Sequence, residues 1–278
     1  MVVRNIDEPF FNTRFFHFLL SLNEMAERRN WSLVGIPDHE GVMNIGGRVG
    51  TARGPNAFWS QFQRLKGREG VLSHLTSFEQ ISGLGSDIEV NHRLAADQIR
   101  IAHGQTGLSV IVGGGHDHAY SHLLGISENK HLGCINIDAH LDVRRPDPRI
   151  TSGSGFYLAL EAKLLSPQSF LEFGVQRHCN GKPLWDYVES KGIPLCPFES
   201  LRGGQAVQGF RQNLKKLAQK TDELVLSLDL DSIAVAFAPG VSAPQAEGFT
   251  PSEIIEMMEI AGANPKVVSL GIFELNPE

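Results

Sequence analysis

The chain has 278 residues, and its 31 acidic side chains outnumber its 25 Lys and Arg, which gives a formal net charge of −6. Ordinary hydrophobic (41%) and charged (20%) fractions exclude intrinsic disorder and collagen-like structure. Three separated cysteines exclude a disulfide scaffold and favour a reduced, cytoplasmic protein, while the acidic balance predicts no nucleic-acid partner. No apolar run approaches the roughly 18–20 residues of a membrane helix, and residues 1–10 lack the apolar core of a secretory signal, so we expect no membrane association.

Short β-rich apolar runs alternate with amphipathic stretches along the chain. The runs predict strands buried on both faces, and the stretches predict helices. In chain order we expect a strand over 31–36, helices over 54–65 and 91–103, strands over 108–112, 132–137 and 171–175, a helix over 205–220, a strand over 224–230, a helix over 251–261 and a strand over 267–273. This alternation predicts an α/β fold with a mainly parallel sheet, and since no linker divides it, we expect one domain over residues 1–278.

Ligand sites in such sheets lie at the carboxyl ends of the strands, so the polar residues after each run are candidates. The run ending at Val112 is followed by three glycines and then His116. The glycines permit a sharp turn that delivers His116 just beyond the strand. A glycine-rich turn with an incidental histidine is the alternative interpretation. A phosphate loop is disfavoured because no Lys and Ser or Thr follow at the Walker spacing.

Asp138, His140 and Asp142 come directly after the 132–137 run, at positions i, i+2 and i+4. In an extended segment these three side chains share one face. Two ionised carboxylates held close together repel each other, and a bound cation relieves that repulsion. The alternative is a strand end whose polar residues are simply solvated.

Asp229 and Asp231 repeat the pattern within the apolar stretch that begins at residue 224. Buried charges need a partner or a metal ion, and salt-bridged or capping aspartates are the alternative. Together the three segments offer four carboxylates and two imidazoles, whose charge of −4 two divalent cations would balance. Oxygen-rich ligation without thiolate favours Mn²⁺ over structural zinc. The residues therefore predict a hydrolytic site with two metal ions.

The segments Gly-Gly-Gly-His-Asp (113–117), Asp-Ala-His-Leu-Asp (138–142) and Ser-Leu-Asp-Leu-Asp (227–231) resemble, in order and spacing, the metal motifs of the ureohydrolase family, which includes arginase, agmatinase and formimidoylglutamase. The resemblance runs from about residue 33 to the end. It implies a three-layer α/β/α arginase-like fold, one ureohydrolase-like catalytic domain over 1–278 and two Mn²⁺ per subunit. By this resemblance one ion is held by His116, Asp138, Asp142 and Asp229, and the other by Asp138, His140, Asp229 and Asp231.

The segment 38–55 resembles the formimidoylglutamase motif Asp-Glu-Gly-Val, then Asn, then Gly-Arg-x-Gly, then Gly-Pro. It departs from that motif at His39, where the family has Asp. The family's Ser-Gly-Thr-Pro-Phe is Ser-Gly-Ser-Gly-Phe here, over residues 152–156, which alters the expected substrate loop. The given sequence ends at Glu278, where members of the family normally continue for about another helix, so we expect either a short member of the family or a truncated sequence.

The resemblance also implies roles at the reaction centre. Asp142 would manage the proton, and Glu274, in a Glu-x-Asn-Pro motif, would face the amidine group of the substrate. A glutamate derivative needs cationic partners. Arg48, Arg144 and Arg177, with Ser152 of the substrate loop, are therefore the candidate substrate-binding residues, and a structural or surface role is the alternative for each arginine.

The residues and the resemblance together predict a cytoplasmic Mn²⁺-dependent hydrolase similar to formimidoylglutamase. The resemblance implies that it converts N-formimidoyl-L-glutamate to L-glutamate and formamide, a step of histidine degradation. We expect a small amidine or guanidine substrate and, by the resemblance, a homo-oligomer. Two alternatives stay open. The first is a guanidine hydrolase that releases urea from arginine, agmatine or a guanidino acid. The second is a catalytically inactive, metal-binding homologue.

Overall fold

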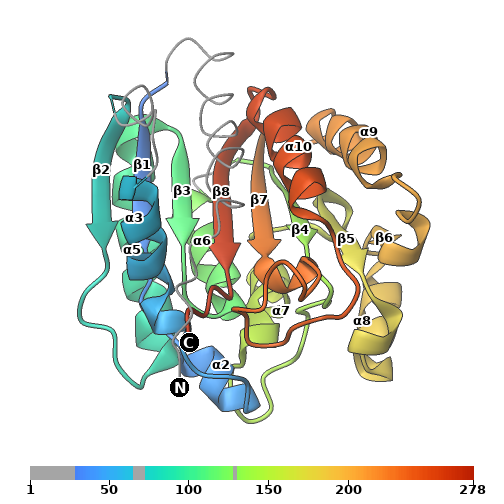
Figure 1. Cartoon of the computed structure of the whole chain (residues 1–278), viewed down its shortest axis with the longest axis horizontal. Helices are drawn as coiled ribbons and strands as arrows, with labels where there is room; N and C mark the ends of the chain where they lie inside the picture. The colour runs from blue at the N-terminus through green and yellow to red at the C-terminus, as the bar shows by residue number, and fades with distance from the viewer. Residues whose placement is uncertain (1–28, 65–72, 128–129) are drawn as a thin grey trace.

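The eight strands of the computed structural model form one parallel sheet in the order β2-β1-β3-β8-β7-β4-β5-β6 (Figure 1). The structure describes residues 29–64, 73–127 and 130–278. All pairings between neighbouring strands are parallel. The strands are β1 (Trp31–Gly35), β2 (Leu75–Gln80), β3 (Ser109–Val112), β4 (Leu132–Ile137), β5 (Phe170–Val175), β6 (Leu195–Pro197), β7 (Glu223–Asp229) and β8 (Val267–Phe273).

Helices cover both faces of this sheet, which makes three layers. One face packs against α3 (Gly54–Arg64), α9 (Ala206–Ala218) and α10 (Pro251–Gly262). The other packs against α5 (Ile88–Thr106), α6 (Ala119–Ile126), α7 (Gly155–Glu161) and α8 (Lys182–Lys191). The short α2 (Glu40–Ile45) lies at the carboxyl end of the sheet, toward the bottom of Figure 1. The predicted α/β architecture with a parallel sheet is confirmed.

Two hydrophobic clusters, one on each face of the sheet, account for the continuous apolar runs in the sequence. Along β4, Ile135 and Ile137 belong to the cluster under α9 and α10, whereas Cys134 belongs to the cluster under α5 and α6. Side chains alternate between the two faces of a strand, so a strand covered on both sides needs apolar residues at every position. This requirement produces the runs that predict the six central strands.

All six predicted strands are present, with ends that differ by one residue or less. The edge strands β2 and β6 were not predicted, because their side chains are largely half-buried or exposed and their sequences show no apolar run. The helix α5 begins earlier than expected, at Ile88, since the side chain of Asp87 accepts hydrogen bonds from the first turn. Residue 65 of the predicted 54–65 helix and residues 1–10 lie outside the described residues.

The strand order brings four carboxyl ends together in the middle of the sheet. β3 and β4 follow each other along the described part of the chain, yet β8 and β7 lie between them. Such a reversal of strand order opens a crevice at the carboxyl ends of the strands, where α/β proteins bind their ligands. None of the described helices is long and apolar enough to cross a membrane.

Candidate metal centre and active site

The turn after β3 brings His116 over the carboxyl ends of the central strands. Gly113 and Gly114 adopt positive φ angles of 108° and 70°, which glycine tolerates best. A Cβ atom on Gly113 would lie only 2.3 Å from Cγ of Pro55, so the turn packs closely against the start of α3. The 3₁₀ turn η3 (His116–His118) follows and holds His116 with 1% of its surface exposed.

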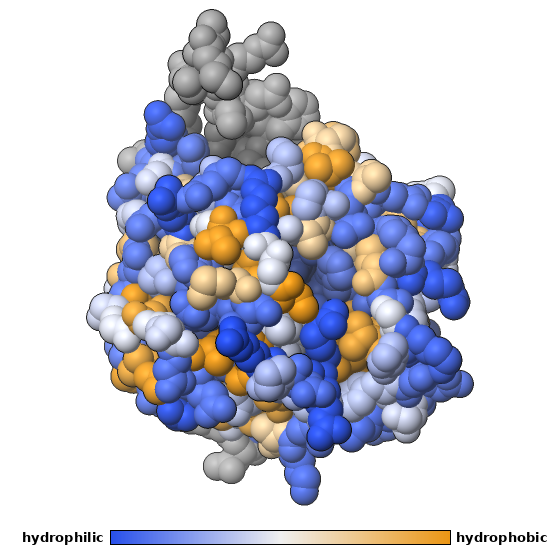
Figure 2. All heavy atoms as spheres, turned by 90° about the horizontal axis from the view of Figure 1, so that it is seen from below, coloured by the Kyte–Doolittle hydropathy of each residue, from blue (hydrophilic) through white to orange (hydrophobic). Residues whose placement is uncertain are grey.

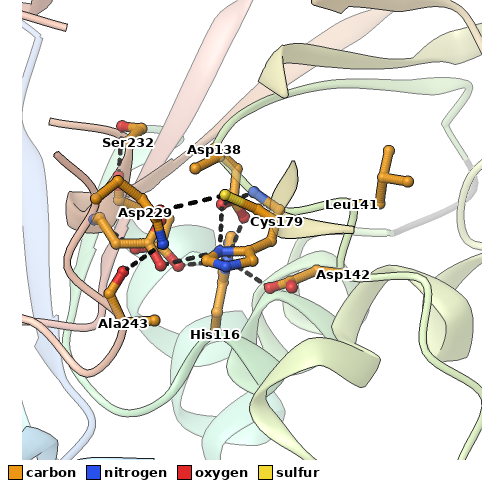
Figure 3. A network of polar contacts seen from close by, with 12 residues as sticks. His116, Asp138, Leu141, Asp142, Cys179, Asp229, Ser232 and Ala243 are labelled. Atoms are coloured by element: carbon orange, nitrogen blue, oxygen red, sulfur yellow. Dashed lines mark hydrogen bonds and ion pairs between the residues drawn. The ribbon is translucent and has the colours of Figure 1, made fainter. Parts of the chain in front are cut away.

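Three carboxylates surround Nδ1 of His116 (Figure 3). This atom lies 3.0 Å from Oδ2 of Asp138, 2.8 Å from Oδ2 of Asp142 and 3.1 Å from Oδ2 of Asp229. Nevertheless, Nδ1 has no hydrogen-bond partner among the described residues. A ring nitrogen that is close to three oxygens without donating to any of them is placed as in a metal site, where all four atoms face a common cation.

Asp138, His140 and Asp231 form a second group beside the first. Nδ1 of His140 lies 3.0 Å from Oδ2 of Asp231 and 3.5 Å from Oδ1 of Asp138. Asp138 therefore presents one oxygen to each group, as a carboxylate that bridges two ions does. The side chain of His140 is 24% exposed, whereas the other five are nearly or fully buried, so the centre is open to solvent on the His140 side.

Asp229 lies in the first group only. Its Oδ1 accepts a hydrogen bond of 2.8 Å from the backbone N–H of Asp231, the next polar position of the turn η8 (Leu230–Ser232). A bridge from Asp229 to the second ion stays a prediction. The contact between Asp229 and Asp231 nevertheless explains the spacing in the sequence, because it fixes the two carboxylates relative to each other at the end of β7.

The charges of this site call for cations. Within the described ranges the four aspartates form salt bridges only with His116 and His140, and no Lys or Arg neutralises them. Burial, together with neighbouring carboxylates, raises the pKa of Asp231 to about 6. Burial alone would lower the pKa of His116, but the three carboxylates beside its ring raise it well above its ordinary value. The negative charge of the clustered aspartates, which would hold a proton at this site, also attracts divalent cations.

Polar residues behind the two groups orient the ligands. Oγ of Ser227 lies 2.8 Å from Nε2 of His116, which leaves Nδ1 to face the carboxylates. Nδ2 of Asn136 donates to Oδ2 of Asp138 at 3.3 Å and to Oε2 of Glu172 at 2.9 Å. Glu172 is fully buried on β5, and burial raises its pKa well above the ordinary value.

Glu274 follows β8 with a φ angle of 63° and is 2% exposed. Its Oε1 accepts a 2.8 Å hydrogen bond from the backbone N–H of His116, and its Oε2 accepts one from the hydroxyl of Ser242. Burial raises the pKa of Glu274 to about 8. The carboxylate thus joins β8, the turn after β3 and the segment around Ser242, beside the first group of ligands.

The three candidate substrate-binding arginines make different contacts. A Cβ atom on Gly153 would lie 3.4 Å from Nε of Arg144 and 3.5 Å from Oδ1 of Asp142, so Arg144 borders the ligand groups. Arg48 is exposed and donates to the carbonyl oxygen of Pro239 at 3.1 Å. The guanidinium of Arg177 lies over the ring of Trp185, 5.5 Å from its centroid.

Ser152 begins the 3₁₀ turn η4 (Ser152–Ser154), and its backbone nitrogen lies 3.0 Å from the position of a Cβ atom on Gly41. The turn over residues 152–154 therefore packs against the start of α2. Figure 2 shows the molecule from below the view of Figure 1. The strands run toward this face, so it lies at their carboxyl ends. This face is mostly hydrophilic, with hydrophobic patches between the polar groups.

Comparison with known proteins agrees with this geometry. The sequence model of the arginase family matches residues 29–278. The chain belongs to the arginase family. A formimidoylglutamase of Geobacillus thermodenitrificans is 32% identical over 88% of this chain and 77% of its own length. The predicted family is confirmed, and with it the predicted class of enzyme, a hydrolase of amidine or guanidine groups.

Solved structures of this family have the same fold. A crystal structure of Trypanosoma cruzi formiminoglutamase with Mn²⁺ superposes with a TM-score of 0.79 at 30% identity, covering 93% of this chain and 90% of that one. Formimidoylglutamase from Bacillus subtilis superposes with a TM-score of 0.81 at 22% identity, covering 90% and 80% of the two chains, and shows the likeness of the fold.

Some residues beside the candidate metal centre were not singled out from the sequence. Asn136 stands two positions before Asp138, and Ser227 two before Asp229, so in each case the strand alternation places the pair on one face. That spacing could have identified both. Glu172 is a charged residue within a run that is otherwise apolar, which is itself a signal for a buried polar contact.

Proposed function

We propose that this arginase-family protein is a binuclear manganese hydrolase that cleaves N-formimidoyl-L-glutamate to L-glutamate and formamide, a step in histidine degradation. The observation that carries the proposal is the pair of ligand groups that share Asp138, one around His116 and one around His140. The similarity to formimidoylglutamases supports the substrate. Cytoplasmic location and a homo-oligomeric state stay predictions.

The donor set suits Mn²⁺. Four carboxylates and two imidazoles, with no thiolate among them, match the preference of this ion for oxygen and nitrogen ligands. We assign one ion to His116, Asp138, Asp142 and Asp229, and the other to Asp138, His140, Asp229 and Asp231. When bound, two such ions supply the Lewis acidity that lowers the pKa of water and polarises the amidine.

Asp142 is the residue we assign to proton transfer. Its Oδ2 faces His116, and Oδ1 lies on the side of Gly153 and Arg144, where the substrate loop begins. A carboxylate in this position can accept the proton of the attacking water and return it to the nitrogen of glutamate as the C–N bond breaks. Water adds to the formimidoyl carbon, and formamide and the free amine leave.

Glu274 has two tasks in this proposal. Its hydrogen bond with the backbone of His116 holds the turn that carries this ligand. As a carboxylate beside the centre, it can also accept a hydrogen bond from the amidine group and stabilise its developing positive charge.

Arginines would bind the two carboxylates of the substrate. Arg144 borders Asp142 and is exposed, which suits it for the carboxylate nearest the reacting carbon. Arg48 and Arg177, together with Ser152, complete the proposed substrate-binding set. This arrangement favours an anionic substrate over arginine or agmatine, whose cationic ends need acidic partners.

A product assay on the manganese-loaded protein tests the proposal. N-formimidoyl-L-glutamate, arginine, agmatine and 4-guanidinobutyrate are supplied separately, and L-glutamate, formamide and urea are measured. We expect equimolar glutamate and formamide from the first compound and no urea from the others. Urea from a guanidine compound would assign the protein to the guanidine hydrolases. No product from any compound, with two ions bound, would favour the inactive homologue.

A further inference from the structure

A second cluster of histidines and carboxylates lies beside the metal centre, and the proposed reaction does not use it. It consists of Asp38, His92, Asp117 and His118, all of which are at most 4% exposed. Asp38 follows β1, His92 belongs to α5, and Asp117 and His118 belong to the turn η3 that also carries His116. Three segments that are distant in the sequence thus meet at these four side chains.

The contacts form two histidine–aspartate pairs side by side. Nε2 of His118 lies 2.9 Å from Oδ2 of Asp38, and Nε2 of His92 lies 2.8 Å from Oδ2 of Asp117. The pairs approach each other, since Nε2 of His118 is 3.9 Å from Oδ2 of Asp117. Asn91 adds a 2.9 Å hydrogen bond to Oδ2 of Asp38.

The geometry of this cluster differs from that of the metal centre. Nε2 of His92 and Nε2 of His118 each make a hydrogen bond to one carboxylate oxygen. Nδ1 of His116 lies close to three carboxylates and hydrogen-bonds with none of the described residues. Each of the two carboxylates in the cluster therefore already has a histidine partner, unlike the three carboxylates that crowd around Nδ1 of His116.

The Asp38 pair anchors the segment that carries Arg48. Oδ1 of Asp38 accepts the backbone N–H of Glu40 at 2.9 Å, and its carbonyl oxygen accepts the hydroxyl of Thr51 at 2.9 Å. Farther along the segment, the side chain of Asn44 donates to the carbonyl oxygen of Ile150 at 2.8 Å, next to the substrate loop. Residues 38–51 are therefore closed into a loop by the bond between Thr51 and Asp38, and this loop is tied to the rest of the chain at Asp38 and at Asn44.

Close packing adds to this connection. Oδ1 of Asp117 would be only 2.1 Å from a Cβ atom on Gly41 and 2.6 Å from one on Gly115. The first turn of α2 thus lies directly on the turn that carries His116. A shift of one against the other would break the Asp38–His118 pair in a buried environment, where an unpaired charge is costly.

We propose that Asp38 and His118 are positioning residues, which join the segment 38–51 to the turn of His116 and so hold Arg48 in place for the substrate. They act through Arg48 and touch neither the substrate nor the reacting atoms. The ion pair therefore sets the apparent affinity for the anionic substrate, while metal binding and the chemical step depend on the neighbouring ligand groups. This effect on the substrate rests on the proposed function.

The test compares D38N with D87A. Asp87 caps α5, the helix that carries His92, so D87A disturbs the same region without removing an ion pair. For D38N we expect the KM for N-formimidoyl-L-glutamate to rise about fivefold or more, with kcat within about twofold of the wild type and two Mn²⁺ retained. Hydrogen exchange should become faster in residues 38–51 and stay unchanged in β7 and β8. For D87A we expect a lower melting temperature and an unchanged KM.

H118Q removes the same ion pair from the other side and gives the same readouts if D38N does not fold. Hydrogen exchange in residues 38–51 and the number of bound Mn²⁺ are both measured without substrate. They therefore test the positioning role even if none of the compounds is turned over. An equal loss of protection across the whole sheet, or a KM unchanged in both variants, would overturn the proposal. Three metal ions in the wild type, with one lost on substitution of His92, would overturn it as well.

Discussion

Glu274 accepts a 2.8 Å hydrogen bond from the backbone N–H of His116, although 158 residues separate them in the sequence. The bond joins the end of β8 to the turn after β3, two neighbouring strands of the sheet. A side chain expected to face the substrate thus also supports the backbone of a proposed metal ligand, so under the proposed function one carboxylate would couple the positions of substrate and metal.

Replacement of Glu274 by Gln tests this coupling. The amide keeps the size of the side chain but cannot ionise at any pH, and it has only one oxygen to accept from His116 or Ser242. We expect kcat/KM to fall by about 100-fold or more. S242A, which removes only the hydroxyl contact, is the matched control and should cost less. Equal activity of E274Q and wild type would contradict the role of this carboxylate.

Asp142 has a positive φ angle of 44°, a conformation that Asn tolerates better than most residues. D142N therefore preserves the backbone while it removes a metal-facing oxygen and the proton acceptor. We expect turnover to fall by about 100-fold or more, with near-native circular dichroism and a cooperative thermal transition. Full activity in this variant, measured by glutamate release at saturating Mn²⁺, would refute the assigned role.

Arg144 borders Asp142, whereas the guanidinium of Arg177 lies over Trp185. We expect R144Q to raise the KM for N-formimidoyl-L-glutamate about tenfold or more, because a charge-assisted hydrogen bond to a carboxylate is lost, and to change kcat less. R177Q serves as the comparison and should have the smaller effect. Steady-state kinetics of both variants decide the matter, and a larger effect in R177Q would reverse the assignment of the two arginines.

His122 makes the stability of the chain depend on pH. Burial, with the nearby charges of His103 and His116, lowers its pKa from the ordinary 6.5 to about 3. Between these values the unfolded chain binds a proton that the folded chain does not. His122 therefore makes the free energy of unfolding fall with decreasing pH, by up to about 1.4 kcal/mol per pH unit.

The H122N variant isolates this contribution. Urea unfolding of the metal-free protein at several pH values between about 6.5 and 4.5 should give a shallower pH dependence in H122N than in the wild type. Metal-free protein is used because protons compete with bound metal for its ligands in this pH range, and metal binding would then add a pH dependence of its own to the stability. If the free energy of unfolding depended equally on pH in the two proteins, the pKa of His122 would be the same in the folded and the unfolded chain, which would contradict the prediction.

The central strands, and the residues that gather into the two candidate ligand groups, could be predicted from the sequence because both depend on local pattern. Asp138, His140 and Asp142 follow one buried run, and the carboxyl ends of parallel strands must share an edge. The pairings between distant segments depend on strand order and could not be predicted. Asp38 meets His118 only because β1 pairs with β3, and Glu172 meets Asn136 only because β5 pairs with β4.

Metal binding tests the central claim most directly. Metal-free protein is titrated with Mn²⁺, bound ions are counted, and the melting temperature is followed. We predict two ions per chain and a rise in melting temperature, since ions that bind only the folded state stabilise it by about 2.7 kcal/mol each when free Mn²⁺ is 100 times the Kd. Electron paramagnetic resonance should show two coupled ions, as expected if Asp138 joins the two groups. A single isolated ion, or an unchanged melting curve after verified metal removal, would contradict the account.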